Sequence, residues 1–186
     1  MKIVNATPSD AEELLEIYSY YVENSAVTFE YTSPSVEEFR NRIITYTAKY
    51  PYLKAIDESG KALGFAFAHY FRERKAYDWA VETTIYLEKN SRHKGVGKAL
   101  YIELEKRLEE MGILNMYACV AHPKKNVDDP YLTADSPNFH LKMGFEAIGI
   151  FHNCGCKFGR WYDMVWYEKI IGEHSENPTP VKFNNI

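Results

Sequence analysis

The feature that most constrains the fold is a turn with two glycines between a β-rich run and a long amphipathic stretch. The turn is Arg92-His93-Lys94-Gly95-Val96-Gly97, and it follows the β-branched and aromatic run Trp79–Leu87. Apolar residues then recur at helical spacing and predict a helix that Gly112 ends, namely Val96, Leu100, Leu104, Leu108 and Met111. A strand, a tight turn and a helix in this order predict helices packed on a sheet.

The same turn has the properties of an anion site. The first N–H groups of a helix have no intrahelical partner, and the helix dipole adds positive potential there. Two glycines in a first helical turn cost roughly 1 kcal/mol each against alanine, so they need a reason. Four basic side chains surround the turn: Arg92, His93, Lys94 and Lys98. We expect a phosphate-bearing ligand here, although neither the Walker nor the Rossmann spacing is present.

The rest of the chain predicts an α/β (or α+β) fold with a mixed sheet. Helices are expected over residues 8–24, from Ser35 with Phe39, Ile43 and Ile44 facing inward, and over Ser136–Met143. Strands are expected at Ile3–Val4, Leu53–Asp57, Leu63–Phe71, Tyr77–Leu87, Asn115–Ala121, Phe145–Cys154 and Arg160–Lys169. The loop Ser25–Pro34 carries Val27, Phe29 and Tyr31, so we expect it to pack over a neighbour. One domain spans 1–172, and the proline-containing tail 173–186 should lack regular structure.

Composition excludes several classes of protein. The net charge of −4 offers no strong positive field for nucleic acid or anionic lipid. No run is long and apolar enough for a membrane span or a signal peptide. Three cysteines argue against a disulfide framework, and Cys154 with Cys156 matches no usual zinc spacing. We therefore expect a cytoplasmic protein without a metal, a nucleic-acid partner or a membrane partner.

Several separate motifs resemble one family. The segment Arg92-x-x-Gly95-x-Gly97 after Thr83-Thr84-Ile85-Tyr86-Leu87 is similar to the acetyl-CoA motif of the GNAT superfamily. Within it, the chain most resembles phosphinothricin (bialaphos-resistance type) N-acetyltransferases over roughly residues 1–170. That closer similarity rests on Lys75-Ala76-Tyr77-Asp78-Trp79, Phe139-His140-x-x-x-Gly144-Phe145 and Lys157-Phe158-Gly159-x-Trp161-x-Asp163.

The resemblance implies a GNAT fold, which is a twisted, mostly antiparallel mixed sheet flanked by helices, and acetyl-CoA as co-substrate. The backbone of Ile85, Tyr86 and Leu87 would pair with the pantetheine arm. Arg92 and His93 would lie beside the pyrophosphate. Backbone amides of the turn and the first helical turn would hold it, namely those of Lys94, Gly95, Val96, Gly97, Lys98 and Ala99. Asn138 is a further candidate contact for the cofactor, and the family implies a homodimer.

Two side chains are candidates for proton transfer. Glu82 is the one charged residue in the β run Trp79–Ile85, where a carboxylate costs energy unless it is paired. The residues alone favour an exposed strand glutamate or an arginine partner, but the resemblance implies a catalytic base, because the family places its catalytic glutamate at this position. His140 matches a position near the coenzyme sulfur, and its role stays open between protonating the thiolate and deprotonating the amine.

The expected function is acetyl transfer to the primary amine of a small amino acid or analogue, of the phosphinothricin, methionine sulfone or methionine sulfoximine type. Phe29, Arg74 and Tyr77 match acceptor positions, with Arg72 and Lys75 as alternatives for binding a carboxylate. Trp161 and Asp163 match a motif that shapes either the pocket or a dimer interface. The segment His122–Thr133 is longer than its family counterpart, which argues against phosphinothricin itself as the acceptor. Acetylation of peptides or polyamines, or a non-catalytic acetyl-CoA sensor, are the alternatives.

Overall fold

The computed structural model describes residues 1–124 and 127–183, which form two interleaved compact units. The first unit comprises Met1–Ile17, Pro34–Met116 and the chain from Ile170 onward. The second comprises Tyr18–Ser33 and Tyr117–Lys169. Helix α1 (Ala11–Asn24) begins in the first unit and ends in the second. Strand β5 (Asn115–His122) is likewise divided between the two units.

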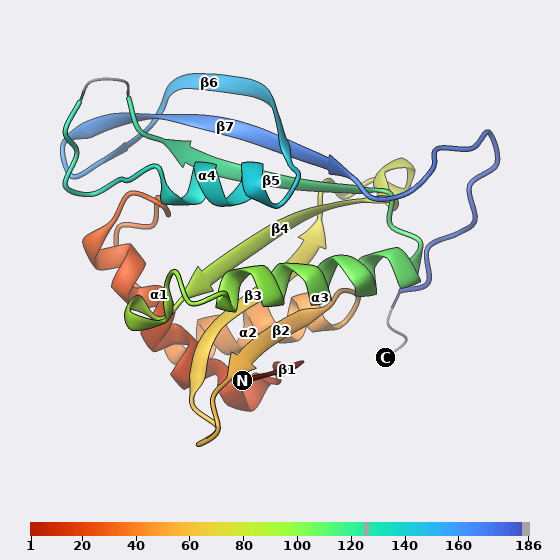
Figure 1. The fold of residues 1–186 in the computed structure, drawn as a ribbon, viewed down its shortest axis with the longest axis horizontal. Coiled ribbons are helices and arrows are strands. Elements are labelled where there is room, and N and C mark those ends of the chain that lie inside the picture. Colours follow the sequence, from red (N-terminus) through yellow and green to blue (C-terminus); the bar gives the residue numbers. More distant parts are fainter. Residues whose placement is uncertain (125–126, 184–186) are drawn as a thin grey trace. The chain divides into compact units, whose positions relative to one another are not determined.

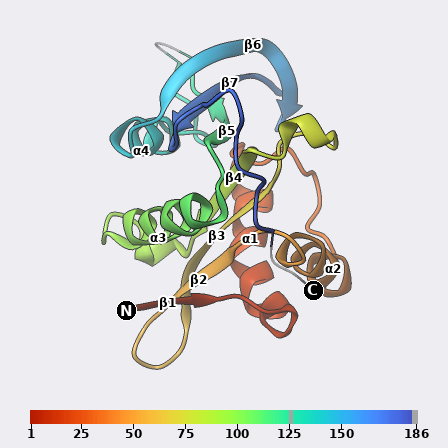
Figure 2. The same ribbon diagram turned by 90° about the vertical axis from the view of Figure 1, so that its right-hand side faces the viewer.

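The first unit contains an antiparallel sheet in the order β1-β2-β3-β4. Its strands are β1 (Lys2–Asn5), β2 (Tyr52–Ile56), β3 (Ala62–Tyr70) and β4 (Ala80–Leu87). The predicted hairpin between β2 and β3 is present, and Asp57 Oδ1 accepts the Ser59 and Lys61 N–H groups in its turn. Figures 1 and 2 show α3 (Val96–Met111) on one face of this sheet and α2 (Val36–Thr47) on the other.

Strand alternation gives the two faces of this sheet different chemistry. On the α3 face, small buried residues such as Ala66 and Ala68 admit the helix, and Thr83 lies 3.4 Å from the Tyr101 hydroxyl. On the α2 face, the rings of Tyr52, Phe65, Phe67 and His69 stack across β2 and β3, and Tyr46 of α2 stacks on Phe67 and His69. The sheet therefore presents small residues to α3 on one side and a layer of aromatic rings to α2 on the other.

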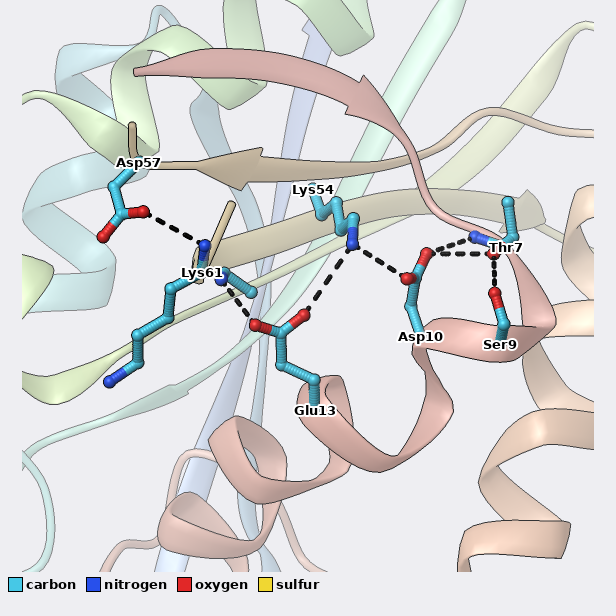
Figure 3. Close-up of polar contacts among 8 residues, drawn as sticks. Thr7, Ser9, Asp10, Glu13, Lys54, Asp57 and Lys61 are labelled. Carbon is cyan, nitrogen blue, oxygen red and sulfur yellow. Dashed lines mark hydrogen bonds and ion pairs between the residues drawn. The ribbon is translucent and has the colours of Figure 1, made fainter. Parts of the chain in front are cut away.

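A polar network holds the start of α1 against this sheet (Figure 3). Lys54 Nζ on β2 lies 2.8 Å from Asp10 and 3.7 Å from Glu13. Glu13 also accepts the Ala62 N–H at 2.7 Å, and Asp10 accepts the Thr7 N–H at 2.7 Å. Burial opposes ionisation of Asp10, but Lys54 and Thr7 outweigh it and lower its pKa.

The second unit contains strands in the order β5-β7-β6, with α4 (Asp135–Lys142) packed beside them. Strands β6 (Glu146–Lys157) and β7 (Arg160–Ile170) form a long antiparallel hairpin, and Ile170 already belongs to the first unit. Its two-residue turn, Phe158-Gly159, has positive φ at both positions, as hairpin turns that follow the twist of the strands require.

Most of the predicted elements are confirmed, with several corrections. The helix expected over residues 8–24 begins as a 3-10 turn, Pro8–Asp10, before α1. Ile44 is not buried: 47% of it is exposed, because it lies one position beyond Ile43 and outside the apolar stripe of α2. Tyr77 does not begin a strand but closes a 3-10 turn over Lys75–Tyr77, in which its N–H donates to the Arg74 carbonyl. Strand β6 continues to Lys157, three residues beyond its predicted end, because it pairs with Arg160 across the hairpin.

The described part of the tail has no regular structure, as expected, and it packs on the first unit. Trp79 Nε1–H donates to the Thr179 carbonyl at 2.8 Å, and the Lys182 N–H donates to the Met111 carbonyl at 2.8 Å. Phe183 then lies edge-on to Tyr50, with ring centroids 5.6 Å apart. Across the described ranges, none of the helices has the length and apolar character needed to cross a bilayer.

Candidate active site

The glycine turn is built as an open helix N-terminus. Gly95 is the N-cap residue of α3 and has a left-handed φ of 83°, a conformation that favours glycine. A side chain at Gly95 would meet nothing within 4 Å, so the space before the helix is clear. The first turn of α3 carries no acidic residue, and Lys94 and Lys98 are exposed beside it. These features fit a pyrophosphate, which the free amides and the nearby ammonium groups would bind.

Glu82 lies on β4, upstream of this turn, on the aromatic face of the sheet. It pairs in register with His69 on β3, and it is half-buried. Burial raises its pKa, while the charges of His69 and Arg72 oppose that rise. The structure thus rejects the simpler expectation of a solvated strand glutamate: this carboxyl group has a partly desolvated position next to two basic side chains.

His69 was not singled out in the sequence, although it lies directly opposite Glu82. Its ring stacks on Tyr46 with centroids 5.2 Å apart, and its Nδ1 lies 3.0 Å from the Tyr70 carbonyl. The register between β3 and β4 could have revealed the pair, but that register depends on where β3 ends and β4 begins, on either side of an irregular connection that contains the 3-10 turn Lys75–Tyr77.

The predicted acceptor residues of the first unit lie in the segment between β3 and β4. Arg74 is the exposed N-cap of the 3-10 turn, and Tyr77 is 40% exposed. The Tyr77 ring packs edge-on against Phe71 at 5.9 Å. The charge of Arg72 acts on the Glu82 carboxyl and opposes the rise in its pKa. The Arg72 guanidinium lies over the Phe71 ring, 4.4 Å from the ring centroid.

His140 lies in the second unit and is almost fully buried, with 3% exposed. Three aromatic rings surround the imidazole, those of Phe139, Phe145 and Tyr167. Its Nδ1 lies 2.8 Å from the Ser136 carbonyl, and a carbonyl can only accept, so Nδ1 carries the proton. Burial lowers the pKa of His140 to about 4, which keeps the ring neutral at pH 7.

Phe29 and Asn138 also belong to the second unit. Phe29 is half-buried and packs against Tyr162 at 6.1 Å, within a cluster that includes Ala26 and Leu132. Asn138 is exposed on α4. The expectation that the Ser25–Pro34 loop packs over a neighbour is confirmed by this cluster. Site residues of the two units are thus Glu82, the glycine turn, Arg74 and Tyr77 in the first, and His140, Asn138 and Phe29 in the second.

The described part of the long His122–Thr133 segment packs on the Phe29 loop. The Ala26 N–H donates to the Tyr131 carbonyl at 2.9 Å, and Leu132 is buried in the same cluster. His122 belongs to β5 rather than to the loop. Residues 125 and 126 of this segment lie outside the described residues.

Trp161 and Asp163 have different surroundings. Trp161 is 59% exposed and lines an open cavity of about 570 Å³ together with Lys124, Asn153 and Arg160. Asp163 accepts the Asn153 N–H at 2.7 Å, where β6 bulges and Asn153 has a left-handed φ of 48°. That hydrogen bond lowers the pKa of Asp163, so this residue stabilises the bulge in its ionised form. Among the described residues, no group of three His, Cys, Asp or Glu side chains is placed to hold a metal.

Comparisons with known proteins show the family to which the chain belongs. The family model described as an acetyltransferase (GNAT) domain matches residues 3–166. A phosphinothricin N-acetyltransferase of Streptomyces coelicolor is 30% identical over 163 residues, which is 86% of this chain and 90% of that protein. An L-methionine sulfoximine/L-methionine sulfone acetyltransferase of Pseudomonas paraeruginosa is 29% identical over 89% of this chain and 92% of its own length.

A solved structure shows the same fold with the coenzyme bound. It is the GNAT superfamily phosphinothricin acetyltransferase of Sinorhizobium meliloti in complex with acetyl-CoA, and it is 36% identical. The TM-score is 0.86, covering 96% of this chain and 92% of that one. The matching profile, the shared fold and the open helix N-terminus lead to one conclusion: this chain belongs to the GNAT family of acetyl-CoA-dependent N-acetyltransferases.

Proposed function

We propose that this enzyme acetylates the primary amine of a small amino acid or analogue, with Glu82 as general base. The observation that carries the proposal is the half-buried Glu82 carboxyl on β4, which faces His69 and whose pKa is raised by burial. The named activities of the relatives point to acceptors of the phosphinothricin, methionine sulfoximine or methionine sulfone type.

The amine nitrogen loses two protons and exchanges one bond. Acetyl-CoA supplies the activated acetyl group as a thioester. The first proton passes from the ammonium to Glu82, and the free amine then forms a bond to the acetyl carbon. As the C–S bond breaks, the second proton leaves the nitrogen, and the coenzyme A thiolate takes up a proton and departs as the free thiol. A carboxylate with a raised pKa is better matched to an amine than an ordinary glutamate, because its proton affinity is higher.

His140, which lies in the second unit, is assigned as a hydrogen-bond acceptor or a positioning group. With Nδ1–H donating to Ser136, its Nε2 has a lone pair and can accept a hydrogen bond. A ring whose pKa is about 4 carries no proton to give at pH 7. Of the two roles left open by the sequence, this favours assistance to the amine over protonation of the thiolate.

The acceptor's carboxylate is assigned to the basic segment between β3 and β4. Arg72 and Arg74 are two residues apart on this segment, and a guanidinium binds a carboxylate through two parallel N–H groups. Tyr77 and Phe29 would contact the acceptor's side chain. The amides of Lys94–Lys98 would hold the pyrophosphate, with Ile85–Leu87 beside the pantetheine and Asn138 as a further contact. The expected contact from Ala99 is dropped, because its N–H donates to the Gly95 carbonyl at 3.0 Å.

An acceptor screen that follows free-thiol release tests the function. The first plate contains methionine sulfone, methionine sulfoximine, phosphinothricin, ordinary amino acids, polyamines and peptides with free N-termini. We expect turnover of the sulfone or sulfoximine. Activity confined to peptides or polyamines would replace the proposed acceptor class, and tight acetyl-CoA binding without any turnover would indicate a sensor.

We also propose that the enzyme is a homodimer. The edge strand β6 exposes large apolar side chains, including Ile148, Ile150 and Phe151, each at least 46% exposed. Bare apolar strand edges are unusual on monomers and favour association. Light scattering coupled to size-exclusion chromatography measures the mass, and a value near 21.6 kDa would contradict a dimer. The cytoplasmic location stays a prediction.

A further inference from the structure

Lys157, the last residue of β6, is a buried lysine to which the proposed function gives no role. It is 2% exposed. Burial lowers its pKa, and the negative charge of Glu30 opposes that effect. A buried ammonium group costs free energy unless it is well paired, so its partners show what it stabilises.

Those partners are main-chain carbonyls of the loop that follows α1. Lys157 Nζ donates to the Ser25 carbonyl at 2.9 Å and to the Thr28 carbonyl at 2.8 Å. The loop has no regular structure, so these carbonyls have no helix or sheet partners of their own. One ammonium group therefore fixes two points of the backbone just before Phe29.

Neighbouring residues of β6 hold the same loop from its other end. The Tyr31 hydroxyl donates to the Cys156 carbonyl at 2.6 Å. Gly155 lies against the Phe29 ring so closely that a Cβ at this position would overlap the ring carbons. The bulge in β6 falls just before Gly155, between Phe151 and Gly155. The end of β6 thus contacts the loop before, at and after Phe29.

We propose that Lys157 is a positioning residue of the acceptor site, which together with Gly155 fixes the orientation of Phe29 and so selects the size of the acceptor side chain. The proposal rests on the proposed function, in which Phe29 contacts the acceptor. The Phe29 ring packs on Tyr162 and Gly155, and the residue remains partly exposed, which leaves room for contact with a ligand.

The test compares Lys157→Met, which keeps the chain length but removes the donors, with Lys157→Arg, which retains donors. Lys142→Met is the matched control, because Lys142 is exposed on α4 in the same unit. For Lys157→Met we expect the KM for methionine sulfone to rise about tenfold while the KM for acetyl-CoA stays within about twofold. Lys157→Arg should recover part of the loss, and Lys142→Met should match the wild type.

A double variant shows whether Lys157 acts through Phe29. If it does, Phe29→Ala combined with Lys157→Met should have the acceptor KM of Phe29→Ala alone, within about twofold. Independent effects that multiply would overturn the proposal. Equal increases in both KM values would also overturn it, because general loosening of the fold does not distinguish the two substrates.

Hydrogen exchange of residues 25–33 gives a readout that needs no turnover. We expect faster exchange in Lys157→Met than in Lys142→Met, and unchanged exchange would refute the anchoring. If the wild type acetylates no amino acid, the proposed function fails, but hydrogen exchange still tests whether Lys157 holds this loop in place. If Lys157→Met does not fold, Gly155→Ala decides: it displaces Phe29 with Lys157 intact, and an unchanged acceptor KM would reject the proposal.

Discussion

The carboxyl group of Glu82 lies on the aromatic face of the first unit's sheet, opposite His69. We expect Glu82→Gln to lower kcat by about 10²–10⁴-fold, the range for removing a general acid or base. In the wild type, kcat/KM should fall on acidification with an inflection above about 4.3, the ordinary glutamate pKa, because burial raises the pKa of Glu82. Steady-state kinetics from pH 4 to 9 measure both effects.

The same raised pKa has a stability consequence with a definite sign. A group with a raised folded-state pKa contributes its stability below the unfolded pKa and loses it as pH rises through the folded value. Glu82→Gln should therefore melt higher than the wild type at pH 7, and this difference should vanish at low pH. Glu12→Gln, an exposed change on α1, is the control. A lower melting temperature for Glu82→Gln at pH 7 would contradict the assignment.

The contribution of His140 to the free energy of unfolding depends on pH in the opposite direction to that of Glu82. Its pKa is lowered to about 4 by burial, so the unfolded chain binds a proton more readily between pH 6.5 and 4. The stability it contributes is full above pH 6.5 and falls by about 3 kcal/mol as pH drops to 4. Urea unfolding at several pH values should show this loss in the wild type and a smaller one in His140→Gln. Identical pH profiles would exclude a depressed His140 pKa.

The role of a single residue could be predicted where it depends on neighbours in the sequence, and not where it depends on contacts with distant parts of the chain. Glu82 stood out because a lone charge interrupts an uncharged β run, which is a property of the sequence itself. His69 did not, because its role comes from cross-strand register with Glu82. Ile44 was wrongly placed inside for a similar reason: one step of 100° around a helix separates the edge of an apolar stripe from solvent.

At the scale of elements, the N-terminus of α3 permits a controlled comparison of two glycines. Gly95 and Gly60 both have left-handed φ values, 83° and 89°, and a Cβ at either would meet nothing within 4 Å. Alanine should cost about 1 kcal/mol of stability at each position. Gly95→Ala alone should raise the KM for acetyl-CoA, because Gly95 is the N-cap of α3 and adjoins the amides that we propose hold the pyrophosphate. Equal KM values for acetyl-CoA in the two variants would contradict a phosphate site at this turn.

Helices and strands could be predicted from the sequence where one local pattern, such as an apolar stripe at helical spacing, was strong. The α3 stripe and the glycines at its two ends predicted that helix closely, since Gly95 and Gly112 are its observed caps. The end of β6 was underestimated because its last residues, Gly155 to Lys157, are held by hairpin pairing and by the distant Ser25–Ser33 loop. Such long-range support leaves no periodic trace in the strand's own sequence.

At the scale of the molecule, the tail contributes to the stability of the first unit. Phe183 packs edge-on against the buried Tyr50, and aromatic pairs of this kind are worth about 1 kcal/mol. Phe183→Ala should lower the free energy of unfolding by about that amount without changing kcat. Denaturant titration measures it, with Ile102→Ala, which removes an exposed apolar side chain of α3 in the same unit, as the control. No loss of stability would mean that the tail contact is not maintained in solution.

The sequence predicted that the tail lacks regular structure but left open whether it frays or packs. The deciding partners are Trp79, Met111 and Tyr50, which come from three separate elements or turns. Their convergence depends on the finished fold. The division into a domain over 1–172 and a tail over 173–186 remains a prediction.

The hydrogen bond from the Trp79 indole to the Thr179 carbonyl also makes the tail optically visible. Indole emission shifts with the polarity and hydrogen bonding around the ring, and the chain has three tryptophans in all. With Trp161 and Trp166 replaced by phenylalanine, the remaining emission would report from the contact itself. Release of the tail could then be followed in real time during unfolding or substrate addition, without attaching a dye.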